Sequence, residues 1–133
     1  MGLLIDTSVL VAIERAGAGG PVGELADEAT FLAAITASEL LHGVHRAGSA
    51  TRRERRQRFV DGILEAVAVL PFDLEAARVH ARIWADLASG GRLIGAHDLL
   101  IAATALANGY GVLTANQRDF DRVDGLAVHL WRG

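Results

Sequence analysis

Short apolar segments alternate with helical segments along the whole chain, and this alternation constrains the fold more than any other feature. The apolar segments have the length and composition of buried parallel strands, and they lie at 2–6, 30–35, 67–70, 111–114 and 126–130. Helical patterns stand between them, at 9–15, 24–29, 36–47, 51–66, 74–88 and 95–108. Strands that alternate with helices form a parallel sheet covered on both faces. We therefore predict an α/β fold, a three-layer α/β/α domain with a mainly parallel sheet of four or five strands.

The ends of several helices also have sequence signals. Thr7 or Ser8 can cap the first helix, and the glycines at 17–23, together with Pro21, break the chain after it. The helix at 95–108 is apolar on nearly every side, so we expect it to be packed in the centre of the domain. A polar loop with one helical turn is expected at 116–124.

Length and composition indicate a single globular domain over residues 1–133. The chain is 51% hydrophobic and 22% charged, a balance that argues against disorder. Cysteine is absent, which excludes disulfide scaffolds, thiolate metal sites and cysteine nucleophiles. No apolar run approaches the roughly 18 residues that cross a bilayer, and the N-terminus lacks the basic region of a signal peptide. We expect a cytoplasmic protein without membrane association.

The charged residues are unusual in kind and in placement. The formal net charge of −3 disfavours simple electrostatic binding to nucleic acid. All the basic residues other than histidine are arginines, however, and the guanidinium group suits phosphate and carboxylate partners. A coding bias that replaces lysine with arginine is the simpler explanation. The stretch 52–58 holds five of the 13 arginines.

Acidic and polar residues stand where open α/β sheets bind ligands, beyond the carboxyl ends of the strands. They are Asp6, which ends the first strand, Glu39 and Asp98, which lie in the first turns of two helices, and Thr114, Asn116 and Asp119, which follow the fourth strand. Simpler structural roles exist for most of them, because acids balance helix dipoles and Asn or Asp residues form turns. Asp6 is harder to explain in this way, since a charge that interrupts a buried strand is costly unless it is paired or bound to a metal.

A metal held by these residues would be held through oxygen. Carboxylate and amide oxygens suit Mg²⁺ or Mn²⁺, and Mg²⁺ keeps several waters when a few carboxylates bind it. Metal-assisted phosphodiester hydrolysis is the chemistry that uses such an arrangement.

Four motifs, in this order along nearly the whole chain, carry a family resemblance. They are LIDTS at 4–8, SELLHG at 38–43, DLLIAATA at 98–105 and LTANQRDF at 113–120. Each motif alone is weakly specific, whereas the ordered set is quite specific. The chain resembles the PIN-domain ribonucleases, and more narrowly the VapC toxins of bacterial type II toxin–antitoxin pairs.

The resemblance implies a PIN domain and a Mg²⁺-dependent endoribonuclease, with Mn²⁺ as a possible substitute, that cleaves structured RNA such as tRNA or rRNA. It also implies a VapB-type antitoxin that inserts a segment near the active site, and a homodimer. By position, Asp6 and Asp98 would be the principal metal ligands, and Glu39 would bind the metal directly or support a ligand. Either Asn116 or Asp119 would fill the fourth acidic place, and one or two metal ions would bind.

Further residues are expected at the edge of this site. Thr114 would form a hydrogen bond near the metal or the phosphate, and Arg92 and Arg118 would contact phosphate. The arginines at 52–58 would contact the RNA backbone, would clamp an acidic segment of the antitoxin, or would form only a solvated helix face. His97 is interpreted as a residue of the helix start rather than a general base.

Several alternatives remain beside this hypothesis. A PIN-like module that binds RNA or protein without catalysis is the main one, because Asn116 is neutral. Haloacid-dehalogenase phosphatases and response-regulator receivers also place an acid after the first strand, but both use a lysine, which this chain lacks. Zinc on Glu39, His42 and His45 is disfavoured because no third histidine lies nearby in the sequence. Trp84 and Trp131 are expected to pack in the core or in a dimer interface.

Overall fold

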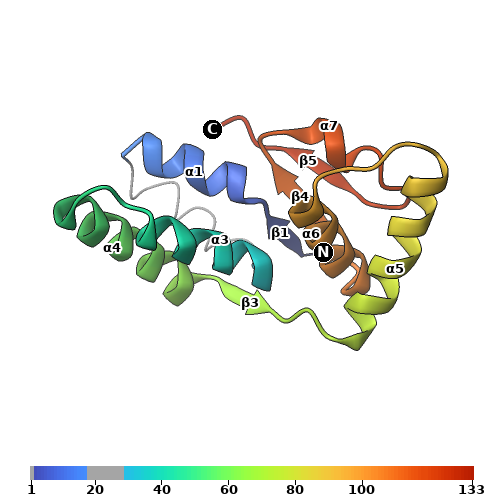
Figure 1. Cartoon of the computed structure of the whole chain (residues 1–133), viewed down its shortest axis with the longest axis horizontal. Coiled ribbons are helices and arrows are strands. Elements are labelled where there is room, and N and C mark those ends of the chain that lie inside the picture. Colours follow the sequence, from blue (N-terminus) through green and yellow to red (C-terminus); the bar gives the residue numbers. More distant parts are fainter. Residues whose placement is uncertain (1, 18–28) are drawn as a thin grey trace.

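The structure, a computed structural model, describes residues 2–17 and 29–133. The helix expected at 24–29 and the break around Pro21 fall mainly on residues 18–28, outside the described residues. Within them, the alternation of strands and helices is confirmed (Figure 1).

All five strands are present and all pair in parallel. They are β1 (Leu3–Ile5), β2 (Thr30–Ala33), β3 (Ala68–Leu70), β4 (Gly111–Thr114) and β5 (Val128–Leu130). Their order in the sheet is β3-β2-β1-β4-β5, so β1 lies in the centre. Because β1 and β4 are neighbours, with Ile5 opposite Leu113, the residues that follow them meet at one edge of the sheet. The sheet therefore brings Asp6 beside the segment that begins with Thr114.

Six helices cover the sheet in the described residues. They are α1 (Thr7–Arg15), α3 (Ala34–His45), α4 (Ala50–Ala66), α5 (Leu74–Ser89), α6 (Ala96–Ala107) and α7 (Gln117–Phe120). Figure 1 shows α1 and α4 on one flank of the molecule and α5 on the other. No helix of the described residues is long and apolar enough to cross a membrane.

Two hydrophobic clusters fill the spaces between sheet and helices. Leu4 packs with α5 and α6, whereas its neighbour Ile5 packs with α1, α3 and α4. This alternation is the period of a strand that is covered on both faces. The predicted central position of α6 is confirmed, because its residues from Ile101 to Ala105 are all buried. Trp131 packs against the second cluster, but Trp84 is 53% exposed.

Three predicted boundaries near the sheet edge are wrong. Helix α1 begins at Thr7, so Asp6 takes the cap position expected for Thr7 or Ser8, and its carboxylate makes no capping bond. Strand β2 ends at Ala33 rather than residue 35, because alanine favours the helix and α3 begins at once. Glu39 consequently lies in the second turn of α3, not the first. Other predicted ends differ from the structure by one or two residues.

Candidate active site

Asp6 lies at the carboxyl end of the central strand and is only 6% exposed. Its backbone N–H donates to the carbonyl of Leu113 at 2.8 Å, which continues the β1–β4 pairing past the last strand residue. No arginine or histidine makes an ion pair with Asp6 within the part of the chain that the structure describes. The sheet therefore carries a buried carboxylate without a cationic partner from this part of the chain.

Two hydroxyl groups hold one oxygen of this carboxylate. Asp6 Oδ2 accepts hydrogen bonds from Ser8 Oγ at 2.6 Å and from Thr114 Oγ1 at 2.8 Å. The backbone N–H groups of Ala115 and Asn116 donate to these same hydroxyl oxygens, at 3.1 and 3.0 Å. Each hydroxyl oxygen thus accepts one hydrogen bond from the loop, which favours a hydroxyl proton that points to Asp6. Within the described residues, oxygen Oδ1 has no such donor and is left for a ligand.

Asp98 faces the same edge of the sheet from the first turn of α6. Burial, together with the negative charges of Asp6, Asp119 and Glu39, raises the pKa of its carboxyl from 3.8 to about 6. His97 opposes the shift in part. Three carboxylates from three other segments of the chain therefore lie close enough to disfavour ionisation of Asp98, an arrangement that a cation relieves.

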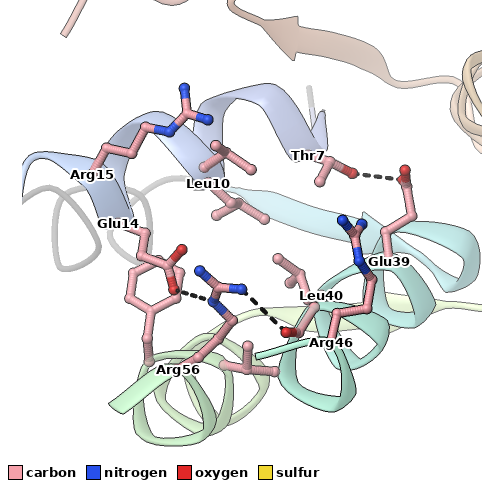
Figure 2. A pocket seen from close by; sticks show the side chains of 12 residues that line it. Thr7, Leu10, Glu14, Arg15, Glu39, Leu40, Arg46 and Arg56 are labelled. Atoms are coloured by element: carbon pink, nitrogen blue, oxygen red, sulfur yellow. Dashed lines mark hydrogen bonds and ion pairs between the residues drawn. The ribbon is translucent and has the colours of Figure 1, made fainter. Parts of the chain in front are cut away.

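Glu39 is held from two sides. Its Oε1 accepts a hydrogen bond from Thr7 Oγ1 at 2.7 Å (Figure 2), and its Oε2 lies 3.3 Å from Nδ1 of His97. Thr7 is the first residue of α1, which follows Asp6, and His97 lies beside Asp98 in the first turn of α6. The two contacts therefore join Glu39 to the helices next to these two acids. The sequence reading left Ser8 and Thr7 out of the site and placed His97 only at the helix start. The signal that could have pointed to Thr7, Ser8 and His97 was their place in the sequence, next to Asp6 and Asp98.

The remaining predicted residues differ in how they relate to this cluster. Asp119 lies in α7, and its negative charge contributes to the raised pKa of Asp98. Asn116 precedes α7, and its side chain makes no capping hydrogen bond. Arg118 is an exposed residue of α7. Arg92 lines a separate hollow with Asp86 and Asp124, away from the carboxylates of the cluster.

The cluster fits a magnesium ion better than a fully protein-bound metal. Over residues 2–17 and 29–133, no three Asp, Glu or His side chains converge on a single point that could enclose an ion, the set of Glu39, His42 and His45 included. Mg²⁺ needs only one or two carboxylates because it retains several waters. Asp6, with its available oxygen, and the neighbouring Asp98 supply these two carboxylates. The negative charges around Asp98 would also be balanced by the bound cation.

A groove of about 360 Å³ leads away from the cluster between α1, α3 and α4 (Figure 2). Thr7 and Glu39 line one end of it, and Leu10, Leu40 and other apolar side chains line its walls. At the other end, Arg56 Nε contacts Glu14 Oε2 at 3.3 Å and Arg56 Nη1 donates to the carbonyl of Gly43 at 3.1 Å. Arg56 thereby bridges α4 to both other helices.

Comparison with known proteins identifies the family. The family model of the PIN domain matches residues 3–126. Ribonuclease VapC1 of Rickettsia felis is 39% identical over 128 residues, which cover 96% of this chain and 95% of that protein. The tRNA(fMet)-specific endonuclease VapC of Shigella flexneri is 33% identical over 100 residues, 75% of this chain and 74% of that protein.

A solved structure is similar in fold over the whole chain. The crystal structure of DNA-bound VapBC from Salmonella typhimurium matches with a TM-score of 0.88 and 26% identity, over 99% of each chain. The parallel sheet, the carboxylates at its edge and these relatives agree, and the chain belongs to the PIN-domain family, in its VapC branch.

Proposed function

We propose that this protein is a Mg²⁺-dependent endoribonuclease toxin, neutralised by a VapB-type antitoxin. The observation that carries the proposal is the buried carboxylate of Asp6, held by two hydroxyl groups, beside Asp98, whose pKa is raised by burial and by the charges of Asp6, Asp119 and Glu39. Curated relatives named as ribonucleases, up to 39% identical over nearly the whole chain, support the same activity.

The residues of the cluster have separate tasks in this proposal. Asp6 and Asp98 hold Mg²⁺, while Ser8 and Thr114 fix the Asp6 carboxylate so that its second oxygen stays available. When bound, the metal supplies an activated water and positive charge for the leaving oxygen.

Proton transfer and bond cleavage complete the reaction. A carboxylate of the cluster, Glu39 or Asp119, accepts the proton of the attacking water. The new bond joins water oxygen to phosphorus while the bond between phosphorus and the 3′-oxygen breaks. The 3′-oxygen leaves with the electron pair of that bond and takes a proton from solvent, which gives 5′-phosphate and 3′-hydroxyl ends.

The proposed substrate is structured RNA, with tRNA or rRNA as its source. The Shigella flexneri relative is named a tRNA(fMet)-specific endonuclease, which supports tRNA as the first RNA to test. Thr114 and Arg118 are the residues we assign to contact near the phosphate, whereas Arg92 lines a separate hollow with Asp86 and Asp124. Specificity would arise from RNA shape.

An RNA cleavage assay tests the enzymatic proposal. The purified chain, freed of partner protein, is incubated with bacterial tRNA and rRNA in Mg²⁺, in Mn²⁺ and in EDTA. We expect cleavage with either metal and none in EDTA, and Asp6→Asn and Asp98→Asn should each abolish it. Asp86→Asn, an exposed acid of α5 outside the cluster, is the matched control and should cleave normally. Absence of cleavage in all arms would favour the non-catalytic binding module instead.

The antitoxin is expected to use the groove between α1, α3 and α4. Solved relatives include VapB–VapC complexes, and the apolar walls of this groove end at Glu39. A partner segment in it would reach the catalytic carboxylates. Val11→Asp, which puts a charge on the groove wall, should weaken inhibition by the antitoxin from the neighbouring reading frame while cleavage by the free toxin persists.

A homodimer is also part of the proposal. Large apolar side chains are exposed on α3, on β3 and the segment after it, and along α5, namely Leu41, Val69, Phe72, Leu74 and Trp84. Ring contacts connect Phe72 to His80 and His80 to Trp84, each with centroids 5.5 Å apart. A contiguous apolar face of this kind is typical of an interface, and a second copy of the chain is the occupant we assign to it.

A further inference from the structure

A second hollow, of about 800 Å³, opens beyond the Glu14–Arg56 contact, at the far end of the groove from Glu39. It shares Glu14, Arg15, Arg56 and Phe59 with the groove, and Glu14 is the one acid among the described residues that line it. Its lining is dominated by arginines from the end of α1 and the beginning of α4: Arg15, Arg52, Arg55, Arg56 and Arg58. A protein of net charge −3 thus concentrates positive charge at one place on its surface.

Most of these arginines have no acidic partner in the part of the chain that the structure describes. Within the described residues, Arg56 alone among them makes an ion pair with a carboxylate, that of Glu14. The first turn of α4 carries Arg52 and Arg53 and no acid, although the helix dipole favours negative charge there, and the first acid of the helix is Glu54. Exposed guanidinium groups that are both unpaired and electrostatically unfavourable at a helix start indicate a surface suited to an external anion.

The lining distinguishes this hollow from the groove beside it. Leu10, Val11, Leu40 and Val60 line the groove, which suits the apolar side chains of a protein segment. No aliphatic side chain lines the second hollow, and Phe59 is its only apolar residue in the described part of the chain. Guanidinium groups bind phosphate through paired, charge-assisted hydrogen bonds. A phosphate-bearing partner therefore fits this hollow better than a peptide does.

The hollow is also too far from the catalytic carboxylates to hold the phosphate that is cut. Thr7 and Arg15 lie at opposite ends of α1, and eight residues of α-helix rise about 12 Å. We infer that Arg15, Arg52, Arg55 and Arg58 form an exosite for the backbone phosphates of the RNA substrate, away from the cleaved bond. This inference rests on the proposed ribonuclease function and adds where the remainder of the RNA is held.

RNA binding tests the exosite without any need for catalysis. Fluorescence anisotropy measures the affinity of Asp6→Asn protein for unfractionated bacterial tRNA as a function of salt. We expect the additional changes Arg52→Ala, Arg55→Ala and Arg58→Ala to weaken binding at least about tenfold at low salt, and to reduce the slope of log K against log salt by about two to three. The control carries Arg78→Ala and Arg82→Ala, exposed arginines of α5, and should bind as the parent does.

Kinetics and a second probe complete the test. In the active protein, the triple variant should raise KM for tRNA while kcat stays near the parent value, because the exosite does not touch the reacting atoms. Poly-L-glutamate serves as the acidic polypeptide probe, and the triple change should alter its binding less than that of tRNA. Unchanged tRNA binding in a folded triple variant, or a loss for poly-L-glutamate equal to or larger than that for tRNA, would overturn the inference. Failure of the ribonuclease proposal would appear separately, as absent cleavage with tRNA binding intact.

Discussion

At the scale of single residues, Asp6 was predictable as a functional residue but its environment was not. An acid at the end of Leu3–Ile5 stands out because it interrupts an apolar strand. That Ser8 and Thr114 bond the same oxygen depends on the pairing of β1 with β4, which joins residues 106 positions apart. Local sequence cannot report such a contact, and for the same reason the bridge from Thr7 through Glu39 to His97 was missed.

Thr114 is the residue through which this positioning is best tested. It is fully buried and donates to Asp6 Oδ2, so Thr114→Val removes a hydrogen bond with little change of shape. We expect Thr114→Val to lower kcat/KM or Mg²⁺ affinity about 10- to 100-fold, as supporting partners of metal ligands do. Thr114→Ser keeps the hydroxyl and should retain most activity. Equal losses in both variants would mean that the methyl group, not the hydrogen bond, matters.

Asp98 predicts how stability depends on pH. Its pKa is about 6 in the folded protein against an ordinary value of 3.8. Between these values the folded state keeps a proton that the unfolded chain has lost, so the metal-free protein should lose stability as pH rises through this window. Asp98→Asn cannot ionise and should be the more stable protein at neutral pH in EDTA.

Thermal unfolding of both proteins across this pH range measures the effect. The difference in Tm should grow from pH 4 to pH 6 and then level off. Under the proposed magnesium binding, added Mg²⁺ should shrink the difference by stabilising the wild-type protein, because a metal ion binds ionised carboxylates. A Tm difference that does not change with pH would contradict the raised pKa of Asp98.

At the scale of helices and strands, sequence patterns predicted which elements exist more reliably than where they end. The prediction of α4 succeeded because its apolar residues repeat at helical spacing, and Val60 and Ile63 are indeed buried. The junction of β2 with α3 was misplaced because Ala33 and Ala34 give no turn or capping signal. Strand and helix meet there without a loop, and only the packing of the sheet decides the boundary.

Helix α4 offers a prediction about its start. Ser49 Oγ accepts a hydrogen bond from the backbone N–H of Arg52 at 3.2 Å, in a turn that has no acidic residue. Ser49→Ala should lower the free energy of unfolding by about 1 kcal/mol, measured by urea denaturation. Ser49→Asp should restore or exceed the parent value, since an acid also balances the helix dipole and the arginines. Destabilisation by Ser49→Asp would contradict this account.

At the scale of the whole molecule, the predicted α/β/α architecture is confirmed because alternation is a global pattern that no single boundary error alters. The candidate acids could be selected from sequence for a related reason. Asp6 follows β1, Asp98 lies in the first turn of α6 and Glu39 lies in the second turn of α3, and a parallel sheet gathers such positions at one edge. Which partner covers the exposed faces of the helices depends on other chains. The alternation of strands and helices carries no information about them.

The exposed apolar face gives the corresponding prediction for assembly. If a second copy covers Leu41, Phe72 and Trp84, light scattering should give the mass of a dimer. Trp84→Arg should give the mass of a monomer, because the substitution would bury a charge in the interface. Leu93→Arg is the matched control: Leu93 is also 53% exposed, but it lies in the segment after α5 and outside the ring contacts of Phe72, His80 and Trp84. A dimer that survives Trp84→Arg and dissociates with Leu93→Arg would assign the interface to the segment that follows α5. Fluorescence supplies a second measure, because emission of Trp84 should shift to longer wavelength on dilution as its ring returns to water.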